Sequence, residues 1–203
     1  MFTLKTALLT ASALALTVPA SASFLDFEDV TSDQFAQTIP SGGYDFAFDT
    51  QGWGILTDSF TSFNRVQNGT TTLCFSGNTQ LTSGNGFVSF KPQDDSAFSM
   101  QSLDAAVFHR GFGDGSMTVT GYYEAGGSTS QQIGFSALWA SYMLNGSFVG
   151  LDRVEIRDDI SGSFFTIPGV QVDNIQINNP VPEPATMVAL GFGAAALLRR
   201  RRK

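Results

Sequence analysis

The stretch Met117-Thr118-Val119-Thr120-Gly121-Tyr122 alternates between two kinds of side chain at every residue. Because successive side chains of a β-strand point to opposite faces, the two apolar side chains and the glycine share one face and the remaining three side chains share the other. Arg153-Val154-Glu155-Ile156-Arg157 repeats this pattern, with aliphatic residues on one face and charges on the other. Glycine-rich turn signals enclose the first stretch, at residues 113–115 and 126–127. The half-buried antiparallel strand is therefore the expected unit of this fold.

Working outward, short apolar or alternating runs recur between clusters of Gly, Ser, Asn and Asp. Residues 137–144 are the only doubtful helical segment between residues 23 and 180, and no internal repeat is evident. This pattern predicts a single all-β domain, an antiparallel β-sandwich of two packed sheets over about residues 24–178. The predicted strands are 24–28, 44–48, 71–75, 86–90, 103–109, 117–123, 131–135, 153–157, 163–167 and 170–177.

Composition separates this body from the two ends of the chain. The 203 residues include 19 phenylalanines and only 14% charged residues, which supports a packed core and argues against disorder. The net charge of −7 is unevenly spread. Residues 23–180 hold five basic and seventeen acidic groups, which leave −12, whereas residues 181–203 carry +4. An acidic body argues against nucleic acid as a partner.

The N-terminal residues 1–22 have the features of a secretory signal peptide. Lys5 supplies the positive start, residues 7–18 form an apolar helix, and Pro19 precedes the A-x-A sequence Ala20-Ser21-Ala22. We therefore expect the secretion machinery to cleave after Ala22, so that Ser23 becomes the first mature residue. A buried helix of the mature fold is the alternative.

The C-terminal residues 181–203 combine three elements in order: Pro182-Glu183-Pro184, an apolar run at 185–198, and the cluster Arg199-Arg200-Arg201-Arg202-Lys203. Fourteen residues make a helix of about 21 Å, short of a hydrocarbon core of about 30 Å. Arginines snorkel to the interface, and positive flanks remain in the cytoplasm. An inner-membrane-anchored state with the body outside is therefore expected.

These three elements resemble a PEP-CTERM sorting signal. The resemblance implies a Gram-negative bacterial protein whose partner is an exosortase, an intramembrane processing enzyme. It also implies removal of the helix near Pro182-Glu183-Pro184 and delivery to the cell surface or extracellular matrix, in association with exopolysaccharide and biofilm material. A plain membrane anchor is the alternative, and it explains the helix and charges but not the Pro-Glu-Pro.

The body resembles carbohydrate-binding-module jelly rolls in three stretches: residues 25–29, residues 98–104 leading to 119–122, and residues 172–177. This resemblance implies that the β-sandwich is a jelly roll whose first and last strands lie side by side, and that a structural Ca²⁺ ties these two strands together. The matching ligand positions are Glu28 and Asp173. Calcium takes six to eight hard oxygen ligands, although no D-x-D-x-D-G loop is present. Solvent-facing positions on edge strands are the alternative.

Catalysis has few candidate residues. His109 is the single histidine and Cys74 the single cysteine, so a nucleophile–base pair would have to use His109. Adjacent aspartates, such as Asp94-Asp95 and Asp158-Asp159, point in different directions and do not form a glycosidase pair. We therefore expect a non-enzymatic protein.

The sequence supports three functional hypotheses. The favoured one is an exported envelope or matrix protein associated with exopolysaccharide. The second is a dedicated carbohydrate-binding module that presents Trp53, which lies between glycines, as a platform for sugar rings, while Trp139 belongs to the core. The third is a polysaccharide-active enzyme.

Overall fold

The computed structural model describes residues 22–49, 54–61, 65–75, 86–111, 113–159 and 169–178, all of which belong to one compact unit, Ser21–Pro180. This described part is built of strands. Their bounds are β1 Ala22–Leu25, β2 Thr38–Ser41, β3 Tyr44–Phe48, β4 Gly54–Leu56, β5 Thr72–Phe75, β6 Phe87–Pro92, β7 Ser99–Val107, β8 Gly115–Tyr123, β9 Ser128–Phe135, β10 Ala140–Met143, β11 Leu151–Asp158 and β12 Val170–Asn178. Within these ranges, no helix is long and apolar enough to cross a membrane.

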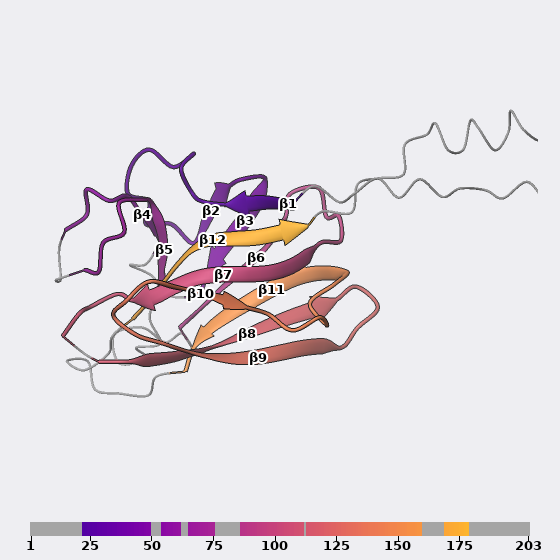
Figure 1. Cartoon of the computed structure of the whole chain (residues 1–203). Coiled ribbons are helices and arrows are strands. Elements are labelled where there is room, and N and C mark those ends of the chain that lie inside the picture. Colours follow the sequence, from indigo (N-terminus) through magenta and orange to yellow (C-terminus); the bar gives the residue numbers. More distant parts are fainter. Residues whose placement is uncertain are drawn as a thin grey trace, which may run out of the picture. The chain divides into compact units, whose positions relative to one another are not determined.

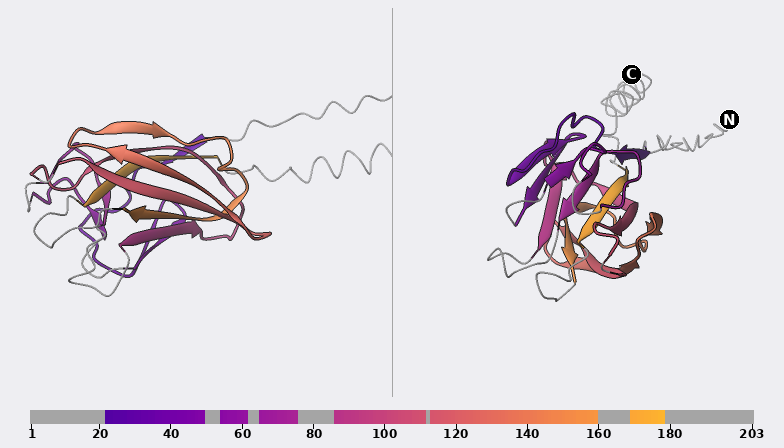
Figure 2. Two further views of the ribbon diagram at one scale, coloured as in Figure 1. Left: turned by 90° about the horizontal axis from the view of Figure 1, so that it is seen from below. Right: turned by 90° about the vertical axis from the view of Figure 1, so that its left-hand side faces the viewer.

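The strands form two antiparallel sheets, which Figures 1 and 2 show as two layers. Sheet A has the order β10-β7-β12-β5-β4, with β1 also paired to β12. Sheet B has the order β2-β3-β6-β11-β8-β9. Most connections pass from one sheet to the other, as between β5 and β6, β6 and β7, and β11 and β12. The fold is the antiparallel β-sandwich that the alternation predicted, with the jelly-roll arrangement that the resemblance implied.

Aromatic side chains fill much of the space between the sheets. Phe46 and Phe90, on neighbouring strands, stack with ring centroids 5.1 Å apart, and Phe27 meets Phe46 edge-on at 5.2 Å. Phe98 packs against Phe90, and all four rings are 1% exposed or less. Each buried aromatic side chain contributes on the order of 2–3 kcal/mol of transfer free energy, so the abundance of phenylalanine is used in the core.

Most predicted strands are confirmed, and β3 is confirmed to the residue. Three short strands were missed, namely β2, β4 and β10, and the doubtful helical segment 137–144 contains the strand β10. The first strand ends at Leu25 instead of residue 28, because Phe27 has a left-handed backbone with φ of 58° and the chain turns there. The predicted strand 163–167 lies outside the described residues.

The first and last strands are neighbours, as the resemblance implied. Ala22 lies opposite Asn178, and Leu25 lies opposite Ile175. Since β7 pairs along the other side of β12, β1 and β5 share one side of this strand: β5 pairs with Val170–Val172 and β1 with Ile175–Asn178. Figure 1 shows β12 between β1 and β7. Between the ends of β1 and β5, Asp173 and Asn174 have no strand partner on that side.

Candidate functional site

Glu28 and Asp173 both accept hydrogen bonds from the segment Asn68–Thr71. Thr70 Oγ1 and Asn68 Nδ2 donate to Asp173 Oδ2 at 2.6 and 2.9 Å. The main-chain N–H of Thr71 donates to Glu28 Oε1 at 2.9 Å. The two predicted ligand residues are therefore linked through one short segment at the gap between β1 and β5, which we call the carboxylate junction.

Asp173 is fully buried, in a strand inside sheet A and not at its edge. Burial raises the pKa of its carboxyl group to about 6, and the hydrogen bonds from Thr70, the Asn174 main chain and Asn68 oppose that rise. The neighbouring Asp104, directly opposite on β7, raises this pKa further. Asn174, in a left-handed conformation with φ of 47°, donates from Nδ2 to Asp104 Oδ2 at 2.9 Å. Burial therefore disfavours the ionised form of Asp173, and a cation bound beside it would favour that form.

The oxygen atoms at the carboxylate junction are of the kinds that calcium binds, namely carboxylate, hydroxyl, amide and main-chain carbonyl oxygens. Within the described ranges, no group of three or more His, Cys, Asp or Glu side chains gathers as a metal site. We nevertheless propose that calcium binds at Glu28 and Asp173. Oxygen atoms of residues 68–71 would complete the set of ligands. The ion would neutralise the Asp173 carboxylate and join β12 to the chain that follows β1.

The other predicted residues occupy different places. Trp53 and Pro182-Glu183-Pro184 lie outside the described residues, whereas Ala22 and Ser23 are the first residues of β1. Trp139 is half-buried and packs against the core, as expected. Cys74 is buried in β5, and burial raises the pKa of its thiol to about 11, so the thiol stays protonated and a poor nucleophile.

A row of charged side chains follows β11 on the outer face of sheet B. Arg153, Glu155 and Arg157 alternate with the apolar Val154 and Ile156 along β11, and Glu155 between the two half-buried arginines is itself only 8% exposed. Glu155 accepts a hydrogen bond from Arg157 Nη2 at 2.8 Å and lies 4.0 Å from Arg153 Nη1. We call these three residues the charged row.

Aromatic rings from the two flanking strands support the charged row. The guanidinium of Arg153 lies over the Tyr122 ring, 4.2 Å from its centroid, and that of Arg157 lies over the Phe87 ring at 5.0 Å. Glu155 is flanked by Ser89 on β6 and Thr120 on β8. Stacking and ion pairing hold the flat guanidinium groups in place, and about two fifths of each arginine side chain remains exposed.

The chemistry of this face suits a ligand rich in hydroxyl groups. The arginines offer N–H donors, and the threonine and serine hydroxyls serve as donors and acceptors, whereas the buried Glu155 is engaged by the two arginines. Further out, Asp159 Oδ2 accepts from Thr118 Oγ1 at 2.8 Å and from Gln132 Nε2 at 3.2 Å, so polar groups continue toward β9. The Arg-Val-Glu-Ile-Arg alternation showed that these charges share one face, but it gave no sign of the rings beside them.

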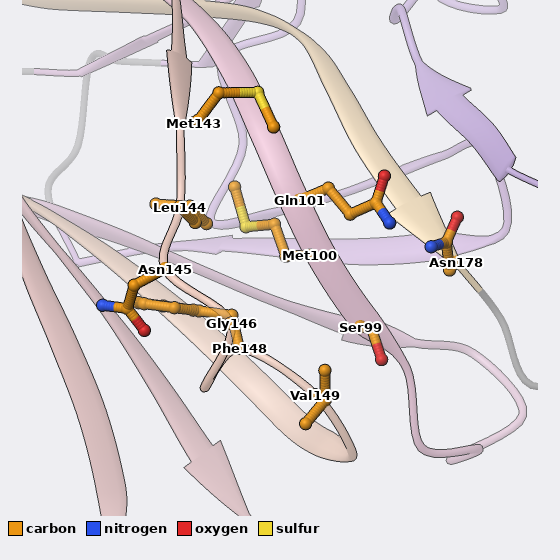
Figure 3. A pocket seen from close by; sticks show the side chains of 10 residues that line it. All are labelled: Ser99, Met100, Gln101, Met143, Leu144, Asn145, Gly146, Phe148, Val149 and Asn178. Carbon is orange, nitrogen blue, oxygen red and sulfur yellow. The ribbon is translucent and has the colours of Figure 1, made fainter.

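A separate cavity of about 350 Å³ opens at the other sheet, where β7 begins and β12 ends (Figure 3). The side chains of Gln101 and Asn178 point toward each other there, and Met143 and Val149 lie at its opposite ends. Its other lining residues are Ser99, Met100, Leu144, Asn145, Gly146 and Phe148. No lining residue is charged, so this cavity lacks the groups that would fix a charged substrate.

These features define an antiparallel β-sandwich with one charged and aromatic sheet face and a carboxylate junction between the exposed Glu28 and the buried Asp173. At its C-terminus, residues 180–203 match the family described as the PEP-CTERM protein-sorting motif. The chain therefore carries this sorting signal, as the residues predicted. No curated protein matches the chain in sequence.

Several solved structures are similar to the body. One is an exo-β-agarase, with a TM-score of 0.49, 13% identity and coverage of 82% of this chain and 26% of that chain. Another is a family 29 carbohydrate-binding module from Piromyces equi, with a TM-score of 0.44, 12% identity and coverage of 81% and 93%. The tandem CBM22 domain of a Paenibacillus barcinonensis protein has a TM-score of 0.43, 13% identity and coverage of 82% and 48%. The chain thus spans about a quarter of the agarase.

Proposed function

We propose that this is a non-catalytic protein of a Gram-negative cell envelope or extracellular matrix, exported and then processed by an exosortase. The sorting motif at residues 180–203 is the observation that supports this destination. The route begins with signal cleavage between Ala22 and Ser23. It passes through an inner-membrane state held by the C-terminal helix and ends with release of the body to the cell surface or matrix.

The mass of the native exported protein tests this route. We expect an N-terminus at Ser23 and a C-terminus near Pro182-Glu183-Pro184, without the arginine cluster. An exported protein that retains its tail through Lys203 contradicts exosortase processing. In a strain without the exosortase, the same protein should accumulate in the membrane with its tail intact.

At its destination, we propose that the body binds exopolysaccharide through the charged row on sheet B. Arg153 and Arg157 would donate hydrogen bonds to sugar hydroxyls, while Glu155, Tyr122 and Phe87 would hold the two arginines in position. This proposal is supported by the stacked and ion-paired geometry of the row.

Binding of the exported protein to purified exopolysaccharide, before and after substitution, tests this role. Arg153→Ala removes donors and the cation–π contact, so we expect affinity to fall roughly tenfold, the equivalent of about 1.4 kcal/mol. Arg110→Ala, which removes an exposed arginine outside this face, is the matched control. Equal affinity of both variants and the unsubstituted protein would exclude the charged row.

The alternative is a carbohydrate-binding module that uses Trp53 as its platform. A glycan affinity that survives Arg153→Ala and disappears in Trp53→Ala would favour this alternative. Turnover of the polysaccharide, dependent on particular carboxylates, would instead indicate the enzyme that we do not expect.

A further inference from the structure

The strand β9 forms a border of sheet B, beside β8 in Figure 1. It pairs with β8 over eight successive residues, Gly115–Tyr122 against Ser128–Phe135, without a register shift. Its sequence, Ser-Thr-Ser-Gln-Gln-Ile-Gly-Phe, contains no charged residue and no proline. A long, regular and uncharged edge strand is a template for pairing with another chain.

The outward main-chain groups of β9 follow from the alternation of antiparallel hydrogen bonds. Tyr123 N–H donates to the Gly127 carbonyl at 3.2 Å, so the odd-numbered residues of β9 exchange hydrogen bonds with β8. The even-numbered residues, Ser128, Ser130, Gln132 and Gly134, then direct their N–H and C=O groups to the outer edge. Consistent with this, the next even-numbered carbonyl, that of Ser136, accepts from Val107 N–H on the far side at 2.9 Å.

The remaining sheet borders of the described part are less suited to pairing. In sheet A, β1 and β10 have four residues each and β4 has three. The opposite border of sheet B, β2, has four residues and includes Pro40, which has no N–H to donate. Short strands and prolines are the devices that block edge-to-edge association. Among these borders β9 alone has neither.

We propose that β9 is a docking edge for a second copy of this chain, with two β9 strands pairing antiparallel around a two-fold axis. An arrangement centred on Gln131 places Ser130 opposite Gln132 of the second copy, with both residues on the outer face. The outward N–H and C=O groups of each strand then meet those of the other. A second copy suits this edge because pairing brings no like charges together within the strands, although the body carries −12 overall.

Pairing about this axis places the outer faces of both B sheets on the same side of the dimer. The two charged rows would then form one continuous surface with two sites for a polymer. Two linked sites bind a repeating ligand more tightly than one site, without any new contact. This bivalency rests on the proposed glycan-binding role, whereas the pairing of β9 does not.

The exported protein, recovered in its processed form, can be tested by sedimentation velocity over a concentration series without any glycan. The unsubstituted protein should be dimeric at high concentration. Ser130→Lys places two like charges near the two-fold axis and should raise the dimer dissociation constant at least tenfold. Ser130→Pro should act in the same way, because it removes an outward N–H and leaves the β8 pairing intact.

Thr38→Lys is the matched control, since it adds the same charge to the opposite border of the same sheet, where Thr38 is exposed. We expect this variant to remain a dimer. A monomer at every concentration, or equal dissociation of the Ser130→Lys and Thr38→Lys dimers, overturns the proposal. A thermal melt of each variant identifies a loss of folding, and the lysine variant still decides if the proline variant unfolds. Unchanged glycan binding in Arg153→Ala, with dimerisation intact in the unsubstituted protein, would exclude the proposed binding role and leave the pairing of β9 standing.

Discussion

At Asp173, burial and hydrogen bonding act on one carboxyl group in opposite directions. Burial is the larger effect, and it raises the pKa from its ordinary value of 3.8 to about 6. Between these two pH values the folded protein holds a proton that the unfolded chain has lost. The free energy of unfolding from this group is therefore highest below about pH 4 and falls as the pH rises through about 6.

We expect that fall to be about 2–3 kcal/mol, since one pKa unit corresponds to about 1.4 kcal/mol. Urea unfolding between pH 4 and pH 7, in the presence of a chelator, measures it. Asp173→Asn removes the titrating group and should flatten the profile relative to the unsubstituted protein. Asp152→Asn, which removes an exposed carboxyl group from β11, is the matched control. Identical slopes for the two variants would contradict this account of Asp173.

Calcium should change the behaviour of the same carboxylate. An ion that binds only the folded state adds about 2.7 kcal/mol at a hundredfold excess over its dissociation constant. Thermal melts with calcium and with chelator should therefore differ at pH 7, and Asp173→Ala or Glu28→Gln should reduce the difference. An unchanged midpoint, or a calcium shift that persists in Asp173→Ala, would exclude the carboxylate junction as the site.

At the scale of the element, β1 is held to the body by one face. Leu25 is 2% exposed, whereas its neighbour Phe24 is 56% exposed on the other face of the same strand. Leu25→Ala should lower the free energy of unfolding by about 3 kcal/mol, because it removes buried methyl groups and leaves a cavity. Phe24→Ala is the control in the same strand and should change it by less than about 0.5 kcal/mol. Denaturant unfolding measures both, and similar losses would show that β1 is not anchored through Leu25.

The elements also show what the sequence could reveal. Long strands such as β8 and β11 could be predicted because the alternation of apolar and polar side chains extends over several residues. The strand β4 could not, because its three residues, Gly54–Leu56, are all buried and have no period. Pro40 in β2 reads as a turn residue, yet an edge strand tolerates it.

The candidate site could be predicted only in part from the sequence, because its residues come from strands that are distant in sequence. The charges of the charged row are local to β11, but Tyr122 and Phe87 come from β8 and β6, which are distant in sequence. The convergence of Glu28 and Asp173 depended on the pairing of β1 with β12, which only the resemblance implied. Non-local strand pairing leaves little trace in a single sequence.

At the scale of the whole molecule, the candidate sites are divided between the two sheets. Sheet A contains the first and last strands and the carboxylate junction, whereas sheet B presents the charged row and the β9 edge. In our proposals, calcium binding and the joining of the chain ends therefore concern sheet A, and glycan binding concerns sheet B. We expect substitutions on the outer face of sheet B to change the proposed binding without altering the residues that join the ends of the body.

The pairing of Ala22 with Asn178 means that the body starts and finishes at neighbouring points, since paired strands lie about 4.8 Å apart. The order of the strands along the sequence is therefore not essential for forming the sandwich. A circular permutant that joins Asn178 to Ser23 through a few glycines, and opens the chain between the exposed Asp94 and Asp95, should give the same circular dichroism spectrum. It should also unfold in a single cooperative transition. In this permutant the two native ends are joined to each other and carry neither the leader nor the tail. Its folding could therefore be studied separately from export of the protein.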